Sequence, residues 1–576
     1  MPFLLRTVLF ILFLSDAIYS EELCEGVQVK DLDELNFSET EKRLVCGDEK
    51  LSAWAKIPAY QAKFHIKSFL QSRGYLSPNV QITNNTLKVD PGKIHTLKNI
   101  RLMPSELIEA KRIEEGMIPL YRDLPITPKL LDQVESGIVE QLRENSYACA
   151  KAQALIFTNG EEVIVQAAKL DRYKFGEVEL ELDEADVLPE AMKRFYPFEA
   201  EQGFNSKLLA LVEKRVVRSG VAQATFFIEG CKNAKLSLSQ GFIWGPPRVL
   251  RFGVGASTEL GPMLRASWSN NRYKNMASKL SAKIEASFRQ QVLELKSDYY
   301  HWEGHPRRSV LTELEISREN QNDFEEVKLE LGSGLKWGLD SVRRFWSWSV
   351  GPKFTQGFYN SDFEEDSKSF EAISISAGVK TLSHDYELYD FHPQQGSSFF
   401  AQVEHRPREL GFDNTLSRLG SGGTIVGKLF SSGRGVVVGA VRFLAQTGLV
   451  DDTVDLEDLP PSVKYYGGGS NDLRGFQLKS RPKNDGLGAL SKLLVKTELR
   501  KTHFFNPALE GFLFYDSARF GERSLEISNQ TYHSPGVGIR WMSPIGLAQF
   551  YYSQAITTSP TEQSDELFYA GLGGEF

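Results

Sequence analysis

The sequence predicts a multi-domain protein in which three small α+β modules precede a transmembrane antiparallel β-barrel. Three observations support this prediction. The N-terminus has the pattern of an export signal, residues 50–243 repeat one helix-and-hairpin pattern three times, and the chain from Pro247 onward alternates in polarity without a helical period. A chain of 576 residues is also too long for one ordinary core, which favours several domains.

The first 20 residues are typical of a secretory signal peptide. Arg6 precedes an apolar run from Val8 to Leu14, and small and polar residues follow as far as Ser20. A membrane anchor is the alternative, but this run is shorter than the roughly 20 apolar residues that a spanning helix needs. No later window approaches that length and apolarity, so any membrane-spanning region after residue 20 is expected to consist of strands.

The four cysteines are expected to meet an oxidising compartment, because an exported chain leaves the reducing cytosol. Cys24, Cys46, Cys149 and Cys231 allow three pairings of two disulfides. We favour a bond between Cys24 and Cys46 because the loop that it closes is short. Four unpaired thiols are the alternative.

Each of the three repeats combines an apolar-periodic helix, a break at a small residue, and two short strands joined by a polar turn. In the first repeat, Ala62, Ile66 and Leu70 lie on one face of the helix AYQAKFHIKSFLQSRGY. The second hairpin turns at Asn159-Gly160, residue types that tolerate positive φ. An α/β enzyme domain is the alternative, but its parallel sheet would need longer crossovers and a ligand-binding loop.

The C-terminal half alternates as expected for strands with one face toward lipid and one toward a lumen. In AKIEASF, the apolar and small residues face one way and the polar residues the other: Ile284, Ala286 and Phe288 against Lys283, Glu285 and Ser287. A soluble β-sandwich is the alternative, and the export signal together with the uninterrupted length of this region disfavours it. We therefore expect a signal peptide at 1–20, modules at 21–92, 93–170 and 171–245, and a barrel at 246–576.

The segment YYGGGSNDLRGF, residues 465–476, sets Arg474 among small and apolar residues. An arginine folded into a lumen against an inner wall needs an anionic partner, because an unpaired buried charge is costly. Glu498 in LVKTELRKT and Asp516 in GFLFYDSARFG lie on alternating strands and point inward if their apolar neighbours face lipid. Three consecutive glycines would let the loop pack its backbone closely.

The motif LRGF resembles the signature loop of the outer-membrane assembly superfamily, whose members include BamA and TamA. The repeats resemble polypeptide-transport-associated (POTRA) modules, and the resemblance implies a barrel of about 16 strands. It further implies that the loop reaches into the barrel and that Arg474 meets Asp516 and Glu498 of the inner wall. The signature-loop residues are then Gly467, Gly468, Gly469, Leu473, Arg474, Gly475 and Phe476.

Longer phrases and the number of modules favour the translocation and assembly module branch, TamA. These phrases are RFGVGASTELGPMLRASW, LPPSVKYYGGGSNDLRGF and GVGIRWMSPIG. The sequence departs from the family pattern at Ala518, where glycine is common, and at Gly574, where a bulky apolar residue is usual. The acidic segment 21–50, which belongs to the first expected module, matches no pattern of the family.

The resemblance implies a factor that inserts or translocates outer-membrane proteins, autotransporters among them, through a lateral gate. This gate would lie between the first strand, RVLRFGVGAST, and the last, ELFYAGLGGEF, where glycines weaken strand packing. The gate residues are expected to be Gly253, Gly255, Gly571, Gly573 and Phe576.

The same resemblance implies a bacterial outer-membrane location with the modules in the periplasm. The implied partners are a TamB-like protein anchored in the inner membrane, unfolded outer-membrane proteins or autotransporters, and outer-membrane lipids. Two alternatives remain. One is the outer-membrane end of a phospholipid conduit with TamB, and the other is a secretion pore for one dedicated protein, which normally has two modules and a plug helix.

Enzymatic and nucleic-acid-binding functions are not expected. A net charge of −8 without a basic tract argues against nucleic acid as a partner. GGTIVGKL has phosphate-loop spacing, but Leu429 replaces the Ser or Thr that would hold magnesium. HWEGH sets two histidines four apart, yet Gly304 and Pro306 disfavour the helix that a zinc protease needs. We expect no metal and no cofactor.

Overall fold

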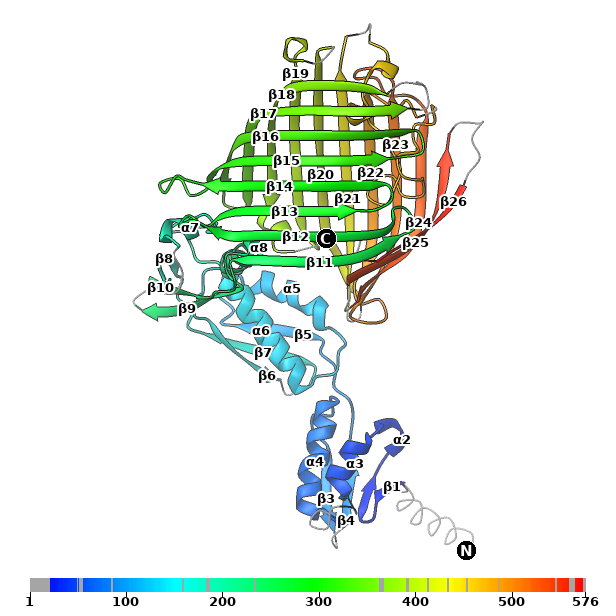
Figure 1. The fold of residues 1–576 in the computed structure, drawn as a ribbon. Coiled ribbons are helices and arrows are strands. Elements are labelled where there is room, and N and C mark those ends of the chain that lie inside the picture. Colours follow the sequence, from blue (N-terminus) through cyan, green and yellow to red (C-terminus); the bar gives the residue numbers. More distant parts are fainter. Residues whose placement is uncertain are drawn as a thin grey trace, which may run out of the picture. The chain divides into compact units, whose positions relative to one another are not determined.

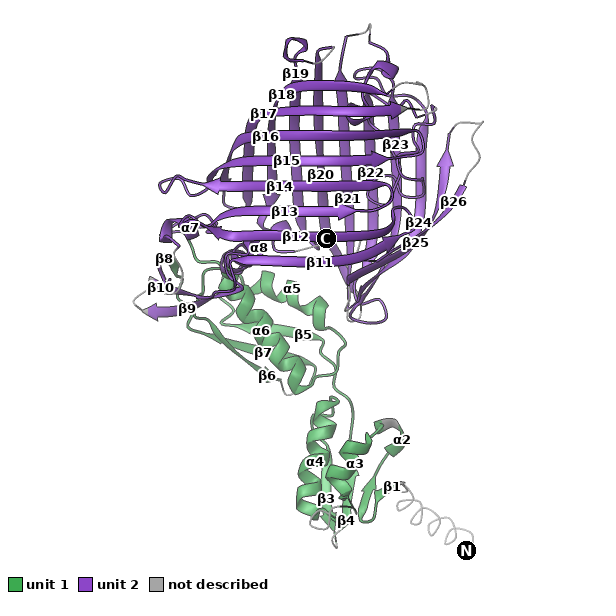
Figure 2. Ribbon diagram, viewed as in Figure 1, with its two compact units in different colours: residues 1–174, 203–206, 233–235 green, residues 175–202, 207–232, 236–576 purple. Residues whose placement is uncertain are grey.

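The computed structural model describes most of the chain in two compact units (Figures 1 and 2). It describes residues 21–572 except 49, 51–54, 84–85, 158–159, 183–186, 233–234, 362–366, 390–392, 412–413, 433–434, 452–453, 485, 544–545 and 559–564. The expected signal peptide, residues 1–20, therefore lies outside the described residues. The first unit comprises residues 1–174, 203–206 and 233–235, and the second 175–202, 207–232 and 236–576. None of the described helices is sufficiently long and apolar to span a membrane.

The first sheet has four strands in the order β1-β2-β4-β3. Helix α4 packs on it because its apolar period buries Ala62, Ile66 and Leu70 in the same core as Leu87 and Val89 of β4. The elements are β1 (Glu21–Cys24), β2 (Val27–Val29), α2 (Leu32–Leu35), α3 (Glu39–Cys46), α4 (Ala59–Ser72), β3 (Asn79–Thr83) and β4 (Thr86–Asp90).

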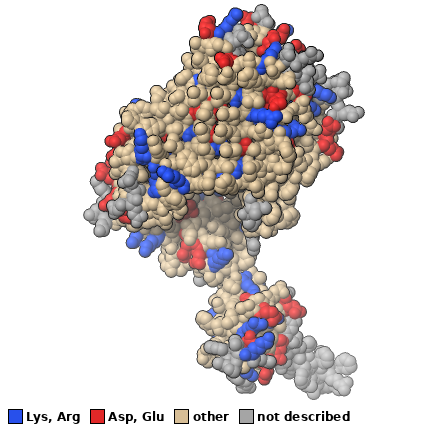
Figure 3. Space-filling view, viewed as in Figure 1, with Lys and Arg blue, Asp and Glu red and all other residues tan. Residues whose placement is uncertain are grey.

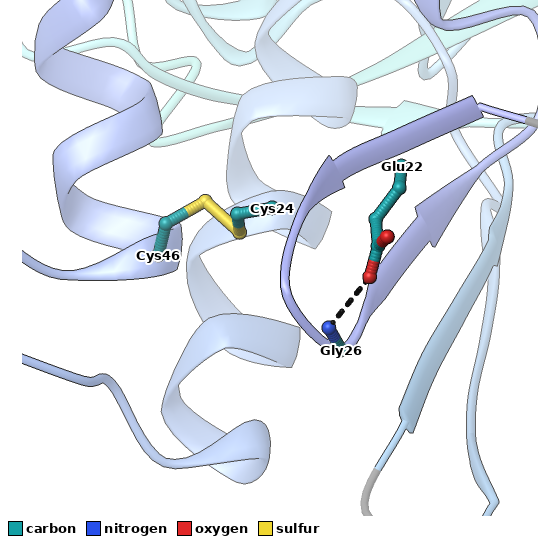
Figure 4. The surroundings of a disulfide bond; sticks show 4 residues. All are labelled: Glu22, Cys24, Gly26 and Cys46. Carbon is teal, nitrogen blue, oxygen red and sulfur yellow. Dashed lines mark hydrogen bonds between the residues drawn. A yellow bond between two sulfur atoms is a disulfide. The ribbon is translucent and has the colours of Figure 1, made fainter.

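The acidic segment 21–50 adds a hairpin to this sheet and contributes two short helices, α2 and α3. β1 pairs with β2, and β2 runs parallel to β4, so the hairpin extends the sheet by two strands. Helix α3 begins with a capping box, in which Ser38 and Glu41 each bond the other's backbone N–H. A disulfide between Cys24 and Cys46, 22 residues apart, joins β1 to the last residue of α3 (Figure 4).

The second sheet has the order β5-β7-β6 and is covered by α5 and α6. Helix α6 begins after Thr127, whose side chain accepts from the N–H of Leu130, with Pro128 in the first turn. Its buried face includes Val134 and Ile138. The elements are β5 (Asn99–Met103), α5 (Ala110–Tyr121), α6 (Pro128–Glu144), β6 (Lys151–Ile156) and β7 (Glu162–Ala168).

The third sheet has the order β8-β10-β9. Its elements are β8 (Lys174–Leu180), α7 (Pro189–Lys193), α8 (Ser206–Ser219), β9 (Ala224–Lys232) and β10 (Lys235–Ile243). Only the segment WGPP, residues 244–247, separates β10 from the next strand, β11. The three sheets confirm the prediction of three small α+β modules.

The remaining strands, β11–β26, form a closed antiparallel barrel of 16 strands, which confirms the predicted barrel. The strands are β11 (Arg248–Ser257), β12 (Gly261–Tyr273), β13 (Ser278–Ala286), β14 (Gln290–Tyr300), β15 (Arg308–Asn320), β16 (Phe324–Asp340), β17 (Arg344–Ser361), β18 (Lys368–Ser383), β19 (Gly396–Arg406), β20 (Leu416–Ser432), β21 (Gly435–Leu449), β22 (Ser491–Lys501), β23 (Leu509–Gly521), β24 (Thr531–Ser543), β25 (Gly546–Thr557) and β26 (Asp565–Leu572).

The barrel wall separates apolar from charged side chains by strand alternation. On β22, Leu493 and Leu499 are about 40% exposed on the outer face, whereas Lys492 and Arg500 are buried on the inner face. Opposite charges face one another across neighbouring strands of the inner wall. Lys296 meets Glu313, for example, and Lys353 of β17 pairs with Glu330 of the neighbouring β16 and with Glu404 of β19, two strands away. The barrel surface visible in Figure 3 is accordingly mostly uncharged.

Within the second unit, an arginine of the third module docks on two turns of the barrel. Arg215 of α8 lies 2.8 Å from a carboxylate oxygen of Asp340, at the end of β16, and 2.8 Å from one of Glu387. Glu387 ends the short helix α9 (His384–Glu387) between β18 and β19. Burial alone would lower the pKa of Arg215, but its hydrogen bonds to Glu387 and Asp340 raise this pKa overall. The guanidinium therefore stays charged.

We expect Arg215→Ala to loosen this docking, because the substitution removes the cation from two carboxylates that are 5% and 10% exposed. Breaking a buried ion pair costs about 3 kcal/mol, and Arg307 still pairs with Asp340. Amide hydrogen exchange in the full-length protein should accelerate in α8 and α9. Val217→Ala, which changes an apolar residue of the same helix that is 45% exposed, is the control. Unchanged exchange in both variants would show that the pair does not stabilise the docking.

Candidate functional site: the luminal loop and the barrel seam

The segment between β21 and β22, residues 450–490, folds back against the inner wall at two apolar clusters. In the first cluster, Leu459 and Val463 pack with Tyr359 and Phe370. The second cluster buries the motif LRGF by packing Leu473 and Phe476 with residues of three late strands and the start of β24: Leu494, Ala518, Phe520, Tyr532 and Ala555. Two short 3-10 helices, Leu456–Asp458 and Pro461–Val463, lie in the first part of the loop.

Arg474 is buried between two carboxylates of the inner wall. Its Nη2 lies 2.7 Å from Asp516 Oδ1, and its Nε and backbone N–H both donate to Asp516 Oδ2, at 2.8 and 3.1 Å. Its Nη1 donates to Glu498 Oε2 at 2.8 Å. The side chains of Arg474 and Asp516 are 4% and 0% exposed, so water contributes little to their solvation. This bidentate arrangement holds both the side chain and the backbone of the loop.

Glu498 also bonds a second arginine, Arg540 of β24. Arg540 donates to both oxygens of Glu498, at 2.7 and 2.9 Å, and to Glu510 at 2.9 Å. The guanidinium planes of Arg474 and Arg540 lie over the rings of Phe514 and Phe512, 3.7 and 4.0 Å from the ring centroids. Sequence analysis missed Arg540, although its position on the alternating strand GVGIRWMSP indicates an inward side chain.

Two of the loop glycines occupy positions that other residues would not tolerate. Gly468 has a φ of 115°, and a Cβ there would lie 1.9 Å from the carbonyl oxygen of Gln477. Gly475 has a φ of 90°, and its Cβ would lie 2.4 Å from Ser534 Oγ on β24. The backbone beside Arg474 therefore lies directly against the wall.

The tip of the loop also contacts the first hairpin of the barrel. The backbone N–H and the hydroxyl of Ser470 both donate to Glu259 Oε2, at 3.3 and 2.9 Å. Glu259 lies in the turn between β11 and β12. The loop that carries Arg474 thus joins strands β22 and β23 to the hairpin that begins the barrel.

The seam between β11 and β26 is short. Among the described residues the two strands share only the pairs Ala256–Leu572 and Ser257–Gly571, whereas β11 and β12 pair along the whole of Arg248–Ser257. Hydrogen bonds between Thr258 and Ala570 extend the contact by one position.

Of the expected gate residues that the structure describes, only Gly571 is paired across the seam. Gly253 and Gly255 pair with β12, opposite Arg265 and Met263, and not with β26. Gly573 and Phe576 lie outside the described residues. From Arg248 to Gly255, the edge of β11 that faces away from β12 has no described strand on it.

This barrel matches a family model over most of its length. Residues 250–576 match the Omp85 superfamily domain. The chain belongs to the Omp85 superfamily. This family contains assembly and transport proteins of outer membranes, which agrees with the barrel fold and assigns the general location and role.

Solved structures are similar to this chain at low sequence identity. BamA from Haemophilus ducreyi lacking POTRA domains 1–3 is 13% identical, with a TM-score of 0.50, over 83% of this chain and 100% of its own. CdiB from Acinetobacter baumannii is 12% identical, with a TM-score of 0.47, over 84% of this chain and 90% of its own. The likeness to BamA extends the shared fold beyond the barrel, since it covers more of the chain than the family model does.

Arg474→Ala should destabilise the barrel, because it leaves Asp516 buried without its bidentate partner. The expected loss is about 3–5 kcal/mol. It would appear as a lower temperature at which the folded form converts to the unfolded form in heat-modifiability electrophoresis. Arg474→Lys should give an intermediate value, since lysine keeps the charge but lacks the planar fork.

The control is Arg442→Ala. Arg442 is an exposed arginine on β21 that donates to the hydroxyl of Thr424. Wild-type conversion temperatures for both Arg474→Ala and Arg442→Ala would contradict a stabilising role for the buried pair.

Proposed function

We propose that this Omp85 protein is an outer-membrane assembly factor of the TamA type, which inserts or translocates outer-membrane proteins, autotransporters included. The observation that carries the proposal is the short seam between β11 and β26. A barrel whose first and last strands share so few pairs can separate there at less cost than at any fully paired neighbour.

The edge of β11 from Arg248 to Gly255, on which no strand is described, is the surface that would receive a client strand. Unpaired N–H and C=O groups at a strand edge form hydrogen bonds with any extended segment, because the main chain is the same in every sequence. The outward side chains Leu250, Phe252 and Val254 are 59%, 76% and 80% exposed, as suits strands that enter lipid. A client hairpin would therefore pair with β11 while its apolar side chains meet the membrane.

In this proposal the Arg474 loop holds the inner wall while the seam opens. Asp516 and Glu498 fix the base of the loop on β23 and β22, and Ser470 contacts Glu259 in the first hairpin. The hairpin is thus attached to the luminal loop through Glu259, whereas no described strand pairs with β11 from Arg248 to Gly255. Arg474 is a structural residue in this mechanism and takes part in no chemical step.

The three modules, with the proposed limits 21–92, 93–170 and 171–245, would lie in the periplasm and receive unfolded clients. Edge strand β6 of the second module exposes Leu155 and Ile156, at 41% and 38%, which supports pairing with an extended apolar segment. A TamB-like partner anchored in the inner membrane is part of this proposal. Three modules rather than two weigh against a dedicated secretion pore.

A disulfide across the seam tests the proposal in cells. Ala256 and Leu572 are direct cross-strand partners, so Ala256→Cys with Leu572→Cys should form a bond without moving the backbone. We expect the locked barrel to stop surface display of an autotransporter, and a mild reductant to restore it. The control is Ala266→Cys with Ile284→Cys, which joins the fully paired strands β12 and β13.

Normal display from the seam-locked protein would contradict the lateral gate. Normal display combined with altered outer-membrane lipid asymmetry in a strain that lacks the protein would instead favour the phospholipid conduit. Loss of display in the β12–β13 control would mean that the loss reflects rigidity of the barrel in general, and would also count against a gate at the seam.

A further inference from the structure

An apolar groove crosses the outer face of the barrel from β17 to β22, with a volume of about 810 Å³. Its floor consists of small side chains that follow one another across neighbouring strands, Ala401, Ser421 and Ala445, which are paired in register. Val350, Val403 and Leu419 rise beside them and are 38–39% exposed.

Strand alternation places this groove on the lipid side of the wall. Residues that alternate with its lining face the lumen and form ion pairs there, such as Lys353 with Glu404. Six neighbouring strands at about 4.8 Å spacing give the groove a length of about 24 Å. Because barrel strands tilt by about 35–45°, the groove runs obliquely between the two faces of the membrane.

Arg344, the first residue of β17, lies on the same outer face near one end of the groove. Its Nε donates to Thr381 Oγ1 at 3.1 Å and its Nη1 to Ser397 Oγ at 2.9 Å. Its Nη2 is buried and finds no hydrogen-bond acceptor within the described part of the chain. No carboxylate of the described residues forms an ion pair with Arg344. The charge is held in place by two hydroxyls and the ring of Phe399, 5.4 Å away, and is not neutralised.

The outer face of β19 connects the arginine to the groove. Ser397 and Phe399 contact Arg344, and the next residues on that face, Ala401 and Val403, line the groove. A ligand that binds Arg344 can therefore extend along one strand into the apolar channel.

Three tryptophans mark the depth of Arg344 in the membrane. Trp337, Trp346 and Trp348 stack in sequence on β16 and β17, with ring centroids 6.1 Å apart. Trp346 and Trp348 follow Arg344 on the outer face of β17. Tryptophan is enriched where hydrocarbon meets headgroups, so Arg344 lies at the level of lipid phosphates, on the side of the barrel to which the third module docks.

We propose that this face binds one phospholipid, with the phosphate on Arg344 and an acyl chain in the groove between β17 and β22. The phosphate would neutralise the guanidinium and accept a hydrogen bond from Nη2 once a rotation of the side chain exposes that atom. A hydrocarbon chain suits the groove better than a polypeptide, because the wall offers no free backbone groups to satisfy a peptide in lipid. The proposal concerns a fixed lipid on the wall, and does not depend on whether the barrel transports protein or lipid.

Native mass spectrometry of the purified full-length protein tests the site. The protein is titrated with phosphatidylglycerol and, separately, with diacylglycerol carrying the same acyl chains. We expect Arg344→Gln to weaken phosphatidylglycerol binding about tenfold, the effect of one charge-assisted hydrogen bond, and to leave diacylglycerol binding unchanged. Ala401→Leu, which fills the groove, should weaken the binding of both lipids.

The matched controls are Arg343→Gln, at the exposed arginine beside Arg344, and Ala282→Leu, at an alanine of β13 that alternates with the inward-facing Lys283. Both should bind as the wild type does. Unchanged binding in Arg344→Gln, or an equal loss in Ala401→Leu and Ala282→Leu, would overturn the proposal. Displacement of phosphatidylglycerol by millimolar inorganic phosphate would reduce the site to a simple anion site and also overturn it.

A measurement on the unmodified protein covers the case in which a variant fails to fold. Brominated phosphatidylglycerol quenches tryptophan fluorescence on contact, and Trp346 and Trp348 lie between Arg344 and the groove. Quenching in detergent should saturate at one lipid per protein and be smaller in Trp348→Phe. Quenching that rises without saturation would mean that no such site exists.

Discussion

The buried pair of Arg474 and Asp516 is the interaction on which the interior of this protein depends. A guanidinium withdrawn from water must be neutralised, and only Asp516 and Glu498 lie within hydrogen-bonding distance of it in the described structure. That requirement determines where the loop between β21 and β22 can lie. Once the loop lies there, Gly475 packs against β24 and the tip of the loop reaches Glu259. The loop thereby contacts the first hairpin, which is also held by the pairing of β12 with β13.

The inner face of the barrel wall must carry polar side chains and the outer face apolar ones, and strand alternation provides both. The inner face gathers charged side chains into pairs such as Lys296 with Glu313, whereas the outer face carries apolar residues. The outer face is not uniform, however. Small side chains on β19, β20 and β21 lower the surface along one row, and Arg344 is a single unneutralised charge at the edge of that row. Such local departures from a uniformly apolar outer face indicate where the wall could bind a ligand.

The sequence predicted the fold because its two halves have different and strong periods. Helical spacing in the first half and alternation in the second depend only on near neighbours in the chain. The inward orientation of Glu498 and Asp516 was predicted in the same way, from the alternation of their strands. The contacts of Arg540 and Glu259 were not, because they depend on strand register and on the course of the 41-residue loop 450–490. The hairpin at residues 21–29 also escaped prediction, since its two strands are only three or four residues long and show too little alternation to be recognised.

Four residues separate the last strand of the third module from the first strand of the barrel, and two of them are Pro246 and Pro247. Proline fixes φ, so this short connection has little backbone freedom to absorb a movement of the third module relative to β11. Arg215 forms ion pairs with Asp340 at the end of β16 and with Glu387 after β18. Strand β10 leads directly into β11, which shares few described pairs with β26. Rotation of the module about Arg215 as a pivot would therefore act on β11 as a lever. A client that pulls on the module would in this way apply force to the strand that it is about to pair with.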